Sequence, residues 1–458
     1  MSHSAASTSP GRFRWVICSL LFFSVAVNYI DRLVLAILKN DLSRDLGWTE
    51  ADYGWITAAF SFAYAFGYLF GGRLMDRWGV KKGLPIFVLL WSCAATAHGL
   101  CGFIAVGHTF SMHLPWFSWA EKSVGWILLT MPMTAAGFML ARIALGLAEG
   151  GNFPGAIKVV AEWFPVKERA LATGLFNAGT NVGAIICPIG VPWLYAHLGW
   201  QSTFYITGGA GFVWVIAWWL VYDSPEQARH LSAAERDYIR EGQPPAEAVP
   251  TRMPWLPLLR HRAVWAYVIA SILAGPAWGF YQFFVPDFLT KRFGLTTQAV
   301  GWWTGAFFAL AAVGGIAGGW LAGWLLERGW TVNGARKISL LICAVAVVPV
   351  FFAPYAGTVW LAVAIVGLAG SAHQGWSANL FSVVSDTMPR EAISSVVGLG
   401  GFTAYFTGGF VNGFTGEILQ RTGSYVPVFA YFSGMYLLSL FALQLLVPRL
   451  GVATVRTS

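Results

Sequence analysis

The chain has 458 residues, of which 57% are hydrophobic and only 11% are charged, whereas soluble domains are about 25% charged. This balance excludes an ordinary soluble domain. The net charge of +8 does not indicate a nucleic-acid-binding protein, because the basic residues gather in alternate loops between apolar stretches, as in membrane proteins.

Twelve apolar stretches follow one another along the chain, and each is long enough for a membrane-spanning helix, which needs roughly 20 residues. The first has no small-residue cleavage site, so we interpret it as a retained helix rather than a signal peptide. The twelve stretches are 15–38, 53–74, 83–106, 133–161, 170–195, 202–222, 264–290, 299–326, 337–354, 358–384, 394–419 and 425–448.

A charged, proline-rich segment separates the sixth stretch from the seventh. Within it, Ser232 is followed three residues later by Glu235, a spacing that predicts the start of a short surface helix. We predict an N-terminal six-helix bundle at 1–222, a linker at 223–263 and a C-terminal six-helix bundle at 264–458. Most loop lysines and arginines lie on the side of the linker, so the linker and both termini are predicted to be cytoplasmic, with the protein in the inner membrane.

The two halves repeat each other weakly, since the loop beginning at Gly72 corresponds to the one beginning at Gly319. An added segment, 107–132, joins the third and fourth helices on the outer face. Its aromatic-rich part, 116–129, is predicted to lie along the membrane surface. A duplicated six-helix unit is typical of transporters whose site lies between the halves near the midplane. We therefore expect an all-α membrane protein with two pseudo-symmetric bundles.

Two acids and two arginines lie inside the first and fourth apolar stretches. Asp31 and Arg32 lie in the first stretch, and Arg142 and Glu149 lie in the fourth. A charge at bilayer depth is costly, and it persists where it faces a partner or a water-filled cavity. Arg142 and Glu149 are seven residues apart, two helical turns, so they share one helix face. Two acids and two bases form a compensated cluster, which predicts a transport site.

Other classes of protein find little support in the sequence. The five cysteines lie in apolar stretches without the spacing of a metal site, so we interpret them as small packing residues. No phosphate-binding glycine loop, His–Glu metal motif or nucleophile elbow is present. We expect no enzyme, no metal and no cofactor. A membrane receptor is the non-transport alternative, although no soluble output domain accompanies these helices.

Several motifs resemble those of a known family. The stretch from Gly72 to Lys82 resembles the signature loop of the major facilitator superfamily. Three further stretches resemble its anion:cation symporter branch, and the last of them is most similar to bacterial hexuronate transporters. Two features depart from the family pattern. Relatives often have Asp at the position of Gly323, and the segment 107–132 is an insert. The three stretches are Asn28-Tyr29-Ile30-Asp31-Arg32, Glu162-Trp163-Phe164-Pro165-x-x-Glu168-Arg169 and Ala372-His373-Gln374-x-Trp376-Ser377-Ala378-Asn379.

The resemblance implies a secondary active transporter that imports a sugar-acid anion, a hexuronate such as galacturonate or glucuronate, by proton symport. In the family, the arginine after the aspartate of the first helix contacts the substrate carboxylate, and Arg32 matches it. A guanidinium suits this role because it forms bidentate hydrogen bonds and keeps its charge when desolvated. A structural ion pair is the alternative role for Arg32. The alternative is a transporter of another organic anion, such as an aldonate or aldarate, that works by uniport or exchange. We expect a monomer in the lipid bilayer.

The two membrane acids are predicted to carry protons. Burial disfavours the charged form of Asp31 and Glu149, and the neighbouring Arg142 and Arg32 oppose that effect. Substrate arrival at an arginine would therefore alter how strongly an acid holds its proton. The alternatives are a permanent salt bridge from Glu149 to Arg142 or to the first helix, and a structural pairing of Asp31 with Arg142.

Polar and aromatic side chains are predicted to bind the sugar. Two tyrosines match positions that the family uses, amides both donate to and accept from hydroxyls, and an aromatic ring covers the C–H face of a pyranose. Interhelical bonding and packing are the alternatives, and His373 is expected to be a neutral, hydrogen-bonded core histidine. The predicted set is Tyr29, Tyr64, Asn177, Tyr281, Gln374, Trp376 and Asn379, with Gln282 as a further cavity candidate.

A gating role is predicted for the loop after the second helix. It contains Asp76, Arg77, Lys81 and Lys82. A carboxylate there can cap a neighbouring helix and pair with the basic residues, holding one conformer and releasing it in the other. A purely topogenic role is the alternative for the lysines.

Overall fold

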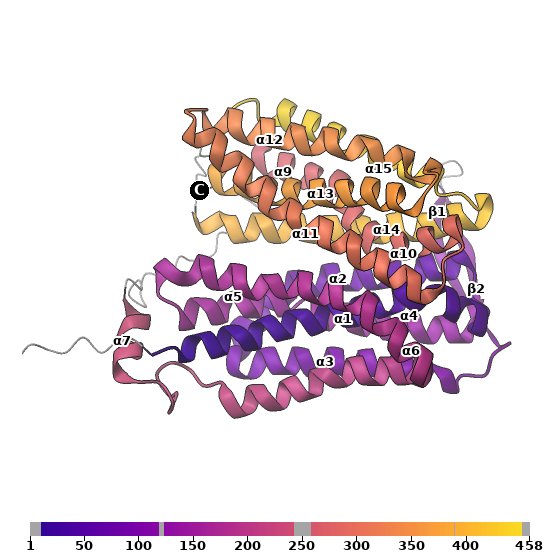
Figure 1. Ribbon diagram of the computed structural model, residues 1–458, viewed down its shortest axis with the longest axis horizontal. Coiled ribbons are helices and arrows are strands. Elements are labelled where there is room, and N and C mark those ends of the chain that lie inside the picture. Colours follow the sequence, from indigo (N-terminus) through magenta and orange to yellow (C-terminus); the bar gives the residue numbers. More distant parts are fainter. Residues whose placement is uncertain (1–10, 119–122, 242–257, 389, 451–458) are drawn as a thin grey trace, which may run out of the picture.

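The structure is a computed structural model that describes residues 11–118, 123–241, 258–388 and 390–450. Figure 1 shows two groups of helices lying side by side, α1 to α6 in indigo to magenta and α9 to α15 in orange to yellow. We call these groups the N-half and the C-half. Across them, α2 packs along α14, and α6 packs along α11.

The helices follow the predicted apolar stretches, with several breaks. The N-half contains α1 Phe13–Leu46, α2 Glu50–Trp78, α3 Val80–Leu100, α4 Met133–Glu149, α5 Asn152–Trp163 and α6 Arg169–Val221, with 3-10 turns at Cys101–Phe103 and Val166–Glu168. The C-half contains α9 Arg262–Ala274, α10 Pro276–Phe293, α11 Thr297–Glu327, α12 Val332–Val347, a 3-10 turn at Val348–Tyr355, α13 Val359–Thr387, α14 Arg390–Thr422 and α15 Val426–Leu446.

Eight helices of the described ranges are long and apolar enough to cross a membrane. One of them lies in α6, which is two helices joined at Gly199, whose φ of 77° lies in the left-handed region that favours glycine. The predicted count of twelve crossings stays a prediction.

The break between α4 and α5 has a packing cause. A Cβ atom added to Gly150 would lie 2.4 Å from the backbone carbon of Gly67 on α2, so the two helices approach more closely than side chains allow. Small residues permit such contacts between membrane helices. Glu149 is the last residue of α4, so this contact fixes the end of the helix that carries its side chain.

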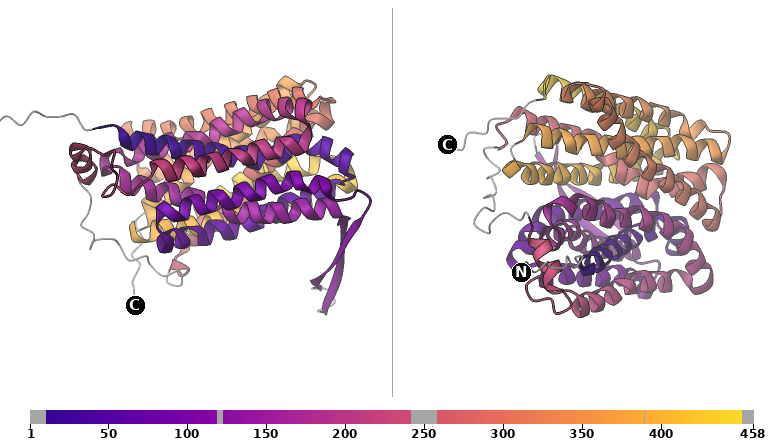
Figure 2. Two further views of the ribbon diagram at one scale, coloured as in Figure 1. Left: turned by 90° about the horizontal axis from the view of Figure 1, so that it is seen from below. Right: turned by 60° about the vertical axis from the view of Figure 1, so that its left-hand side comes forward.

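The added segment is a β-hairpin, which corrects the expectation of helices alone. Strands β1 (Thr109–Ser118) and β2 (Ser123–Pro132) pair antiparallel, from Thr109 opposite Pro132 to Ser118 opposite Ser123. Aromatic and β-branched residues favour strands, and the segment is rich in both. Figure 2 shows the hairpin at one end of the helices, extending across the direction of their axes, and the position of 116–129 along the membrane surface stays a prediction. We call this end the hairpin end.

The short helix predicted after Ser232 is present as α7, Ala233–Arg240. Ser232 accepts a hydrogen bond from the backbone N–H of Glu235, and the carboxylate of Glu235 in turn accepts bonds from the backbone N–H groups of Phe13 and Arg14, both at 3.1 Å. An acid at a helix N-terminus satisfies otherwise free donors. In this way α7 docks onto the start of α1, at the end opposite the hairpin, which we call the α7 end (Figure 1). Residues 242–257 of the predicted linker lie outside the described residues.

Candidate functional site

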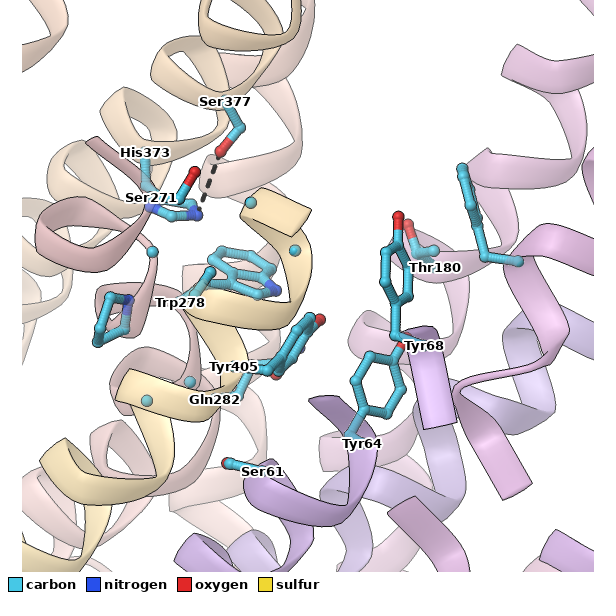
Figure 3. A pocket seen from close by; sticks show the side chains of 18 of the residues that line it. Ser61, Tyr64, Tyr68, Thr180, Ser271, Trp278, Gln282, His373, Ser377 and Tyr405 are labelled. Atoms are coloured by element: carbon cyan, nitrogen blue, oxygen red, sulfur yellow. Dashed lines mark hydrogen bonds between the residues drawn. The ribbon is translucent and has the colours of Figure 1, made fainter. Parts of the chain in front are cut away.

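A cavity of about 340 Å³ lies between the N-half and the C-half. Side chains from both halves face it, as Figure 3 shows for Tyr64 and Tyr68 on one side and Trp278 and Tyr405 on the other. Its polar and aromatic lining consists of Asn28, Tyr29, Ser61, Tyr64, Tyr68, Glu149, Asn152, Phe153, Asn177 and Thr180 from the N-half, and Tyr267, Ser271, Trp278, Gln282, Phe283, His373, Gln374, Trp376, Ser377, Phe381 and Tyr405 from the C-half.

A buried ion pair lies at the N-half wall of this cavity. Nη2 of Arg32 is 2.8 Å from Oε2 of Glu149, and Nε of Arg32 donates to the same oxygen at 3.0 Å. Both side chains are about 1% exposed. The guanidinium also lies 4.9 Å from the ring centre of Tyr29 and 4.6 Å from that of Tyr64. Rings at this distance stabilise a desolvated cation, so a single guanidinium is held directly behind the lining of the cavity.

Asp31 and Arg142 lie deeper in the N-half. Arg142 donates one hydrogen bond, from Nη1 to the backbone carbonyl of Arg32, at 3.0 Å. Neither carboxylate oxygen of Asp31, nor Nε or Nη2 of Arg142, has a hydrogen-bond partner among the described residues. No Asp31–Arg142 ion pair is present in this part of the chain. The structural pairing kept as an alternative for Asp31 is therefore not made in this conformation, whereas the salt bridge from Glu149 to the first helix is made.

The C-half wall carries rings and neutral polar groups. Trp278 stacks on His373, with ring centres 5.3 Å apart and an interplanar angle of 7°. The two nitrogens of His373 face the hydroxyls of Tyr436 and Ser377, the latter at 3.4 Å. His373 is thus a buried, hydrogen-bonded histidine at the cavity edge. Of the described residues that line the cavity, Glu149 alone is an acid, and none is a lysine or arginine.

A second charge cluster joins the two halves at the hairpin end. Nζ of Lys39, two turns before the end of α1, lies 2.8 Å from Glu50 on α2 and 2.7 Å from Asp287 on α10. Lys291 lies 2.7 Å from the same glutamate and 3.0 Å from the same aspartate. The hydroxyl of Tyr425 also donates to Asp287. Asp41 accepts a bond from Thr297 nearby at 2.6 Å.

These contacts tie the N-half to the C-half at the hairpin end. A neutral hydrogen bond between the halves lies nearer the cavity, where the amide of Asn412 donates to Ser61 at 3.1 Å. Lys39 and Asp287 are both buried, so the charges depend on one another for compensation. The cavity is therefore closed off by charged contacts toward the hairpin end in this conformation.

A family model described as Major Facilitator Superfamily matches residues 21–413. The chain belongs to this superfamily. It is a multi-pass membrane transporter, and its family is not one of enzymes.

Several transporters resemble this chain over nearly their whole length. The hexuronate transporter of Escherichia coli (strain K12) is 30% identical over 426 residues, covering 91% of this chain and 90% of that one. The probable galactarate/D-glucarate transporter GudP of Bacillus subtilis (strain 168) is 28% identical, covering 98% and 95%. The inward open structure of the xylose transporter XylE from E. coli superposes with a TM-score of 0.71 at 14% identity, covering 95% and 96%, which shows the shared fold alone.

The cavity brings together most of the side chains predicted to bind substrate. Those that line it are Tyr29, Tyr64, Asn177, Gln374 and Trp376, together with the predicted proton carrier Glu149. Arg32 lies directly behind this lining. Asp31 and Arg142 lie farther back, outside it. Trp376 is only 1% exposed, and its ring meets Tyr436 edge-on at 5.4 Å, so little of its face is open to a ligand.

Besides Arg32, two further predicted substrate ligands do not line the cavity. The amide of Asn379 donates to the backbone carbonyls of Gly318 and Gly375, both at 2.9 Å. It therefore joins α13 to α11, as in the interhelical alternative. Tyr281 is fully buried and packs on Phe307 and Phe432. The physical reason is helix rotation: on α10, Tyr281 points into the C-half while its neighbour Gln282 faces the cavity.

The predicted gating residues make no described contact with the C-half. Lys81 pairs with Asp223, which follows α6, so this contact stays within one end of the N-half. Arg77 and Lys82 are exposed, and the side chain of Asp76 lies outside what the structure describes. A gating role for these four residues remains a prediction for the opposite conformation, in which the halves would close at the α7 end.

Sequence reasoning missed several lining residues and the cluster at the hairpin end. Trp278 and Tyr405 had no signal beyond being aromatic, since rings are frequent throughout the chain. Asn28 did carry a sequence signal, because it precedes Arg32 by one helical turn. In the structure it accepts a hydrogen bond from Arg32 at 3.3 Å. Asp287 had the same signal as Asp31, an acid inside a predicted span, and Lys39 was taken as a loop residue although it is 1% exposed within α1.

Proposed function

We propose that the protein is a secondary active transporter that imports a sugar-acid anion, in the first place a hexuronate such as galacturonate or glucuronate, together with protons by alternating access. The named relatives support an anionic sugar as the cargo, because one is a hexuronate transporter and another a probable galactarate/D-glucarate transporter. The proposed place of action is the inner membrane, with both termini in the cytoplasm.

The Arg32–Glu149 ion pair carries the proposal. Arg32 is paired with Glu149, and Glu149 lines the cavity itself. A substrate carboxylate that reaches Arg32 must displace the carboxylate of Glu149. Removing one partner from a buried ion pair costs about 3–5 kcal/mol, because the remaining charge is uncompensated. Protonation of Glu149 avoids this cost, since a neutral acid leaves the guanidinium free for the substrate.

This competition couples substrate binding to proton binding. With Glu149 charged, the pair is closed and the site disfavours an anion. With Glu149 protonated, the anion binds, and the loaded site has one positive charge paired with one negative charge. Asp31 and Arg142 lie near the pair, and both have side-chain atoms without a hydrogen-bond partner among the described residues. We assign Asp31 as the second proton carrier, with Arg142 opposing its protonation. Reciprocal coupling of this kind is what a symporter requires.

The proposal predicts a defined result in vesicles. Purified protein in liposomes should accumulate radiolabelled galacturonate when the outside is more acidic than the inside, and a protonophore should abolish the accumulation. Arg32→Lys serves as the binding-defective control. Equal accumulation with and without the proton gradient would contradict symport and favour uniport or exchange. Absence of uptake of uronates, aldonates and aldarates alike would contradict the sugar-acid assignment.

A further inference from the structure

The cavity contains an aromatic surface that the sequence does not single out. Trp278 lies on α10, is half-buried, and lines the cavity. One face of its indole ring is covered by His373 at an interplanar angle of 7°, and Phe308 meets it edge-on at 6.2 Å. No ring of the described residues stacks on its other face. In Figure 3 the indole extends from α10 into the space that Tyr405 and Tyr64 border from below.

A polar group accompanies this surface on the same helix face. Gln282 follows Trp278 by four residues, one helical turn, so both side chains point to the cavity. Its amide is 1% exposed, and Nε2 has no hydrogen-bond partner among the described residues. On the facing wall, Nδ2 of Asn28 is likewise without a partner in the described chain. Buried donors of this kind need acceptors, and sugar hydroxyls supply them.

The charge of the cavity limits the ligand to one carboxylate. Arg32 pairs with Glu149 of the lining on the N-half side, and none of the described lining residues is itself a lysine or arginine. The C-half wall contributes rings, hydroxyls and amides, and His373 has two hydroxyls as its described partners rather than an acid. A second carboxylate would be desolvated there without a counter-charge, which is costly.

We propose that Trp278 is the ring platform of the substrate site, and that it makes the transporter select a cyclic sugar acid with one carboxylate over open-chain aldonates and aldarates. The carboxylate binds Arg32, one C–H face of the pyranose lies on the free face of Trp278, and the hydroxyls bind Gln282 and Asn28. An open chain has no flat C–H face to stack, and an aldarate adds a second charge. This inference rests on the proposed function and names the substrate class within it.

Three acids on one carbon skeleton test the inference. Galacturonate is cyclic with one carboxylate, galactonate is open-chain with one, and galactarate is open-chain with two. Binding to the purified protein should weaken in that order, by about tenfold at each step, the size expected for losing one aromatic contact or one charge pairing. Equal binding of galacturonate and galactonate would overturn the ring selection, and equal binding of galactarate would overturn the single-carboxylate rule, while either result leaves a sugar-acid transporter in place.

Variants at Trp278 attribute the selection to this residue. Trp278→Leu should weaken galacturonate binding about tenfold and leave galactonate binding nearly unchanged, whereas Trp278→Phe, which keeps a flat ring, should retain most of the preference. Trp376→Leu is the matched control, since that ring is packed against Tyr436 and its loss should affect both ligands alike. An equal loss for both ligands in Trp278→Leu, or a selective loss in Trp376→Leu, would contradict the platform role of Trp278. If none of the three acids binds the wild-type protein, the proposed function itself fails.

Discussion

Lys39 and Asp287 form a buried ion pair, 2.7 Å from Nζ to Oδ1, that joins α1 of the N-half to α10 of the C-half. The two residues are 248 positions apart in the chain. Both lie toward the hairpin end, beyond the cavity. In alternating access the two halves must separate at one end as they close at the other, so this pair must break each time the cavity opens to the hairpin side.

Lys39→Met should therefore favour opening at the hairpin end. It leaves Glu50 and Asp287 with Lys291 as their remaining described lysine partner, and losing one member of a buried pair costs about 3–5 kcal/mol. In a cysteine-free background, a cysteine at Ser61 in the cavity should react faster with an impermeant thiol reagent added from the hairpin side. Arg44→Met is the control, because that side chain is 68% exposed and surface pairs contribute little. Equal reactivity in the two variants would contradict a closing role for Lys39.

Arg32→Lys should impair transport much more than folding. Lysine keeps the charge but loses the two donors, Nε and Nη2, that now reach one carboxylate. Hydrogen bonds to charged groups contribute about 1.5–3 kcal/mol, so substrate binding should weaken about tenfold to a hundredfold. The measurement is galacturonate binding to protein that elutes as a single species. Near-normal uptake would move carboxylate recognition elsewhere, with Arg142 as the next candidate.

Glu149→Gln should separate proton-driven accumulation from exchange. The amide resembles a protonated glutamate and cannot release a proton, so Arg32 stays available to substrate. Counterflow between loaded vesicles should persist, whereas accumulation driven by an inward proton gradient should fall by orders of magnitude. Asp31→Asn should behave in the same way if both acids carry protons. Retained gradient-driven accumulation in Glu149→Gln would leave Asp31 as the sole carrier.

The predicted orientation can be tested at two described positions. Ser111 is exposed on the hairpin, and Glu241 is exposed at the end of α7. In a cysteine-free background, a cysteine at Ser111 should react with an impermeant reagent added to intact cells. A cysteine at Glu241 should react only after the membrane is permeabilised. The reverse pattern would place the hairpin in the cytoplasm and overturn the assignment of the termini.

The order of the helices was predictable from the sequence, because a membrane helix must satisfy its backbone hydrogen bonds within one long apolar stretch. The same logic singled out Asp31, Arg32, Arg142 and Glu149, since charges inside such stretches are rare. That logic left residues 107–132 outside the apolar stretches, and strand-forming side chains make this added segment a hairpin.

Only the tertiary structure decided which of these charges meet. Arg32 could pair with either acid by sequence, and the close approach of Gly150 to Gly67 positions Glu149 as its partner. The rotation of α10 decides that Trp278 and Gln282 face the cavity while Tyr281 is buried in the C-half. The pairing of Lys39 with Asp287 depends on how two halves pack. Periodicity within one helix does not contain the relative rotation and depth of helices distant in the chain, because these are set by side-chain packing between them.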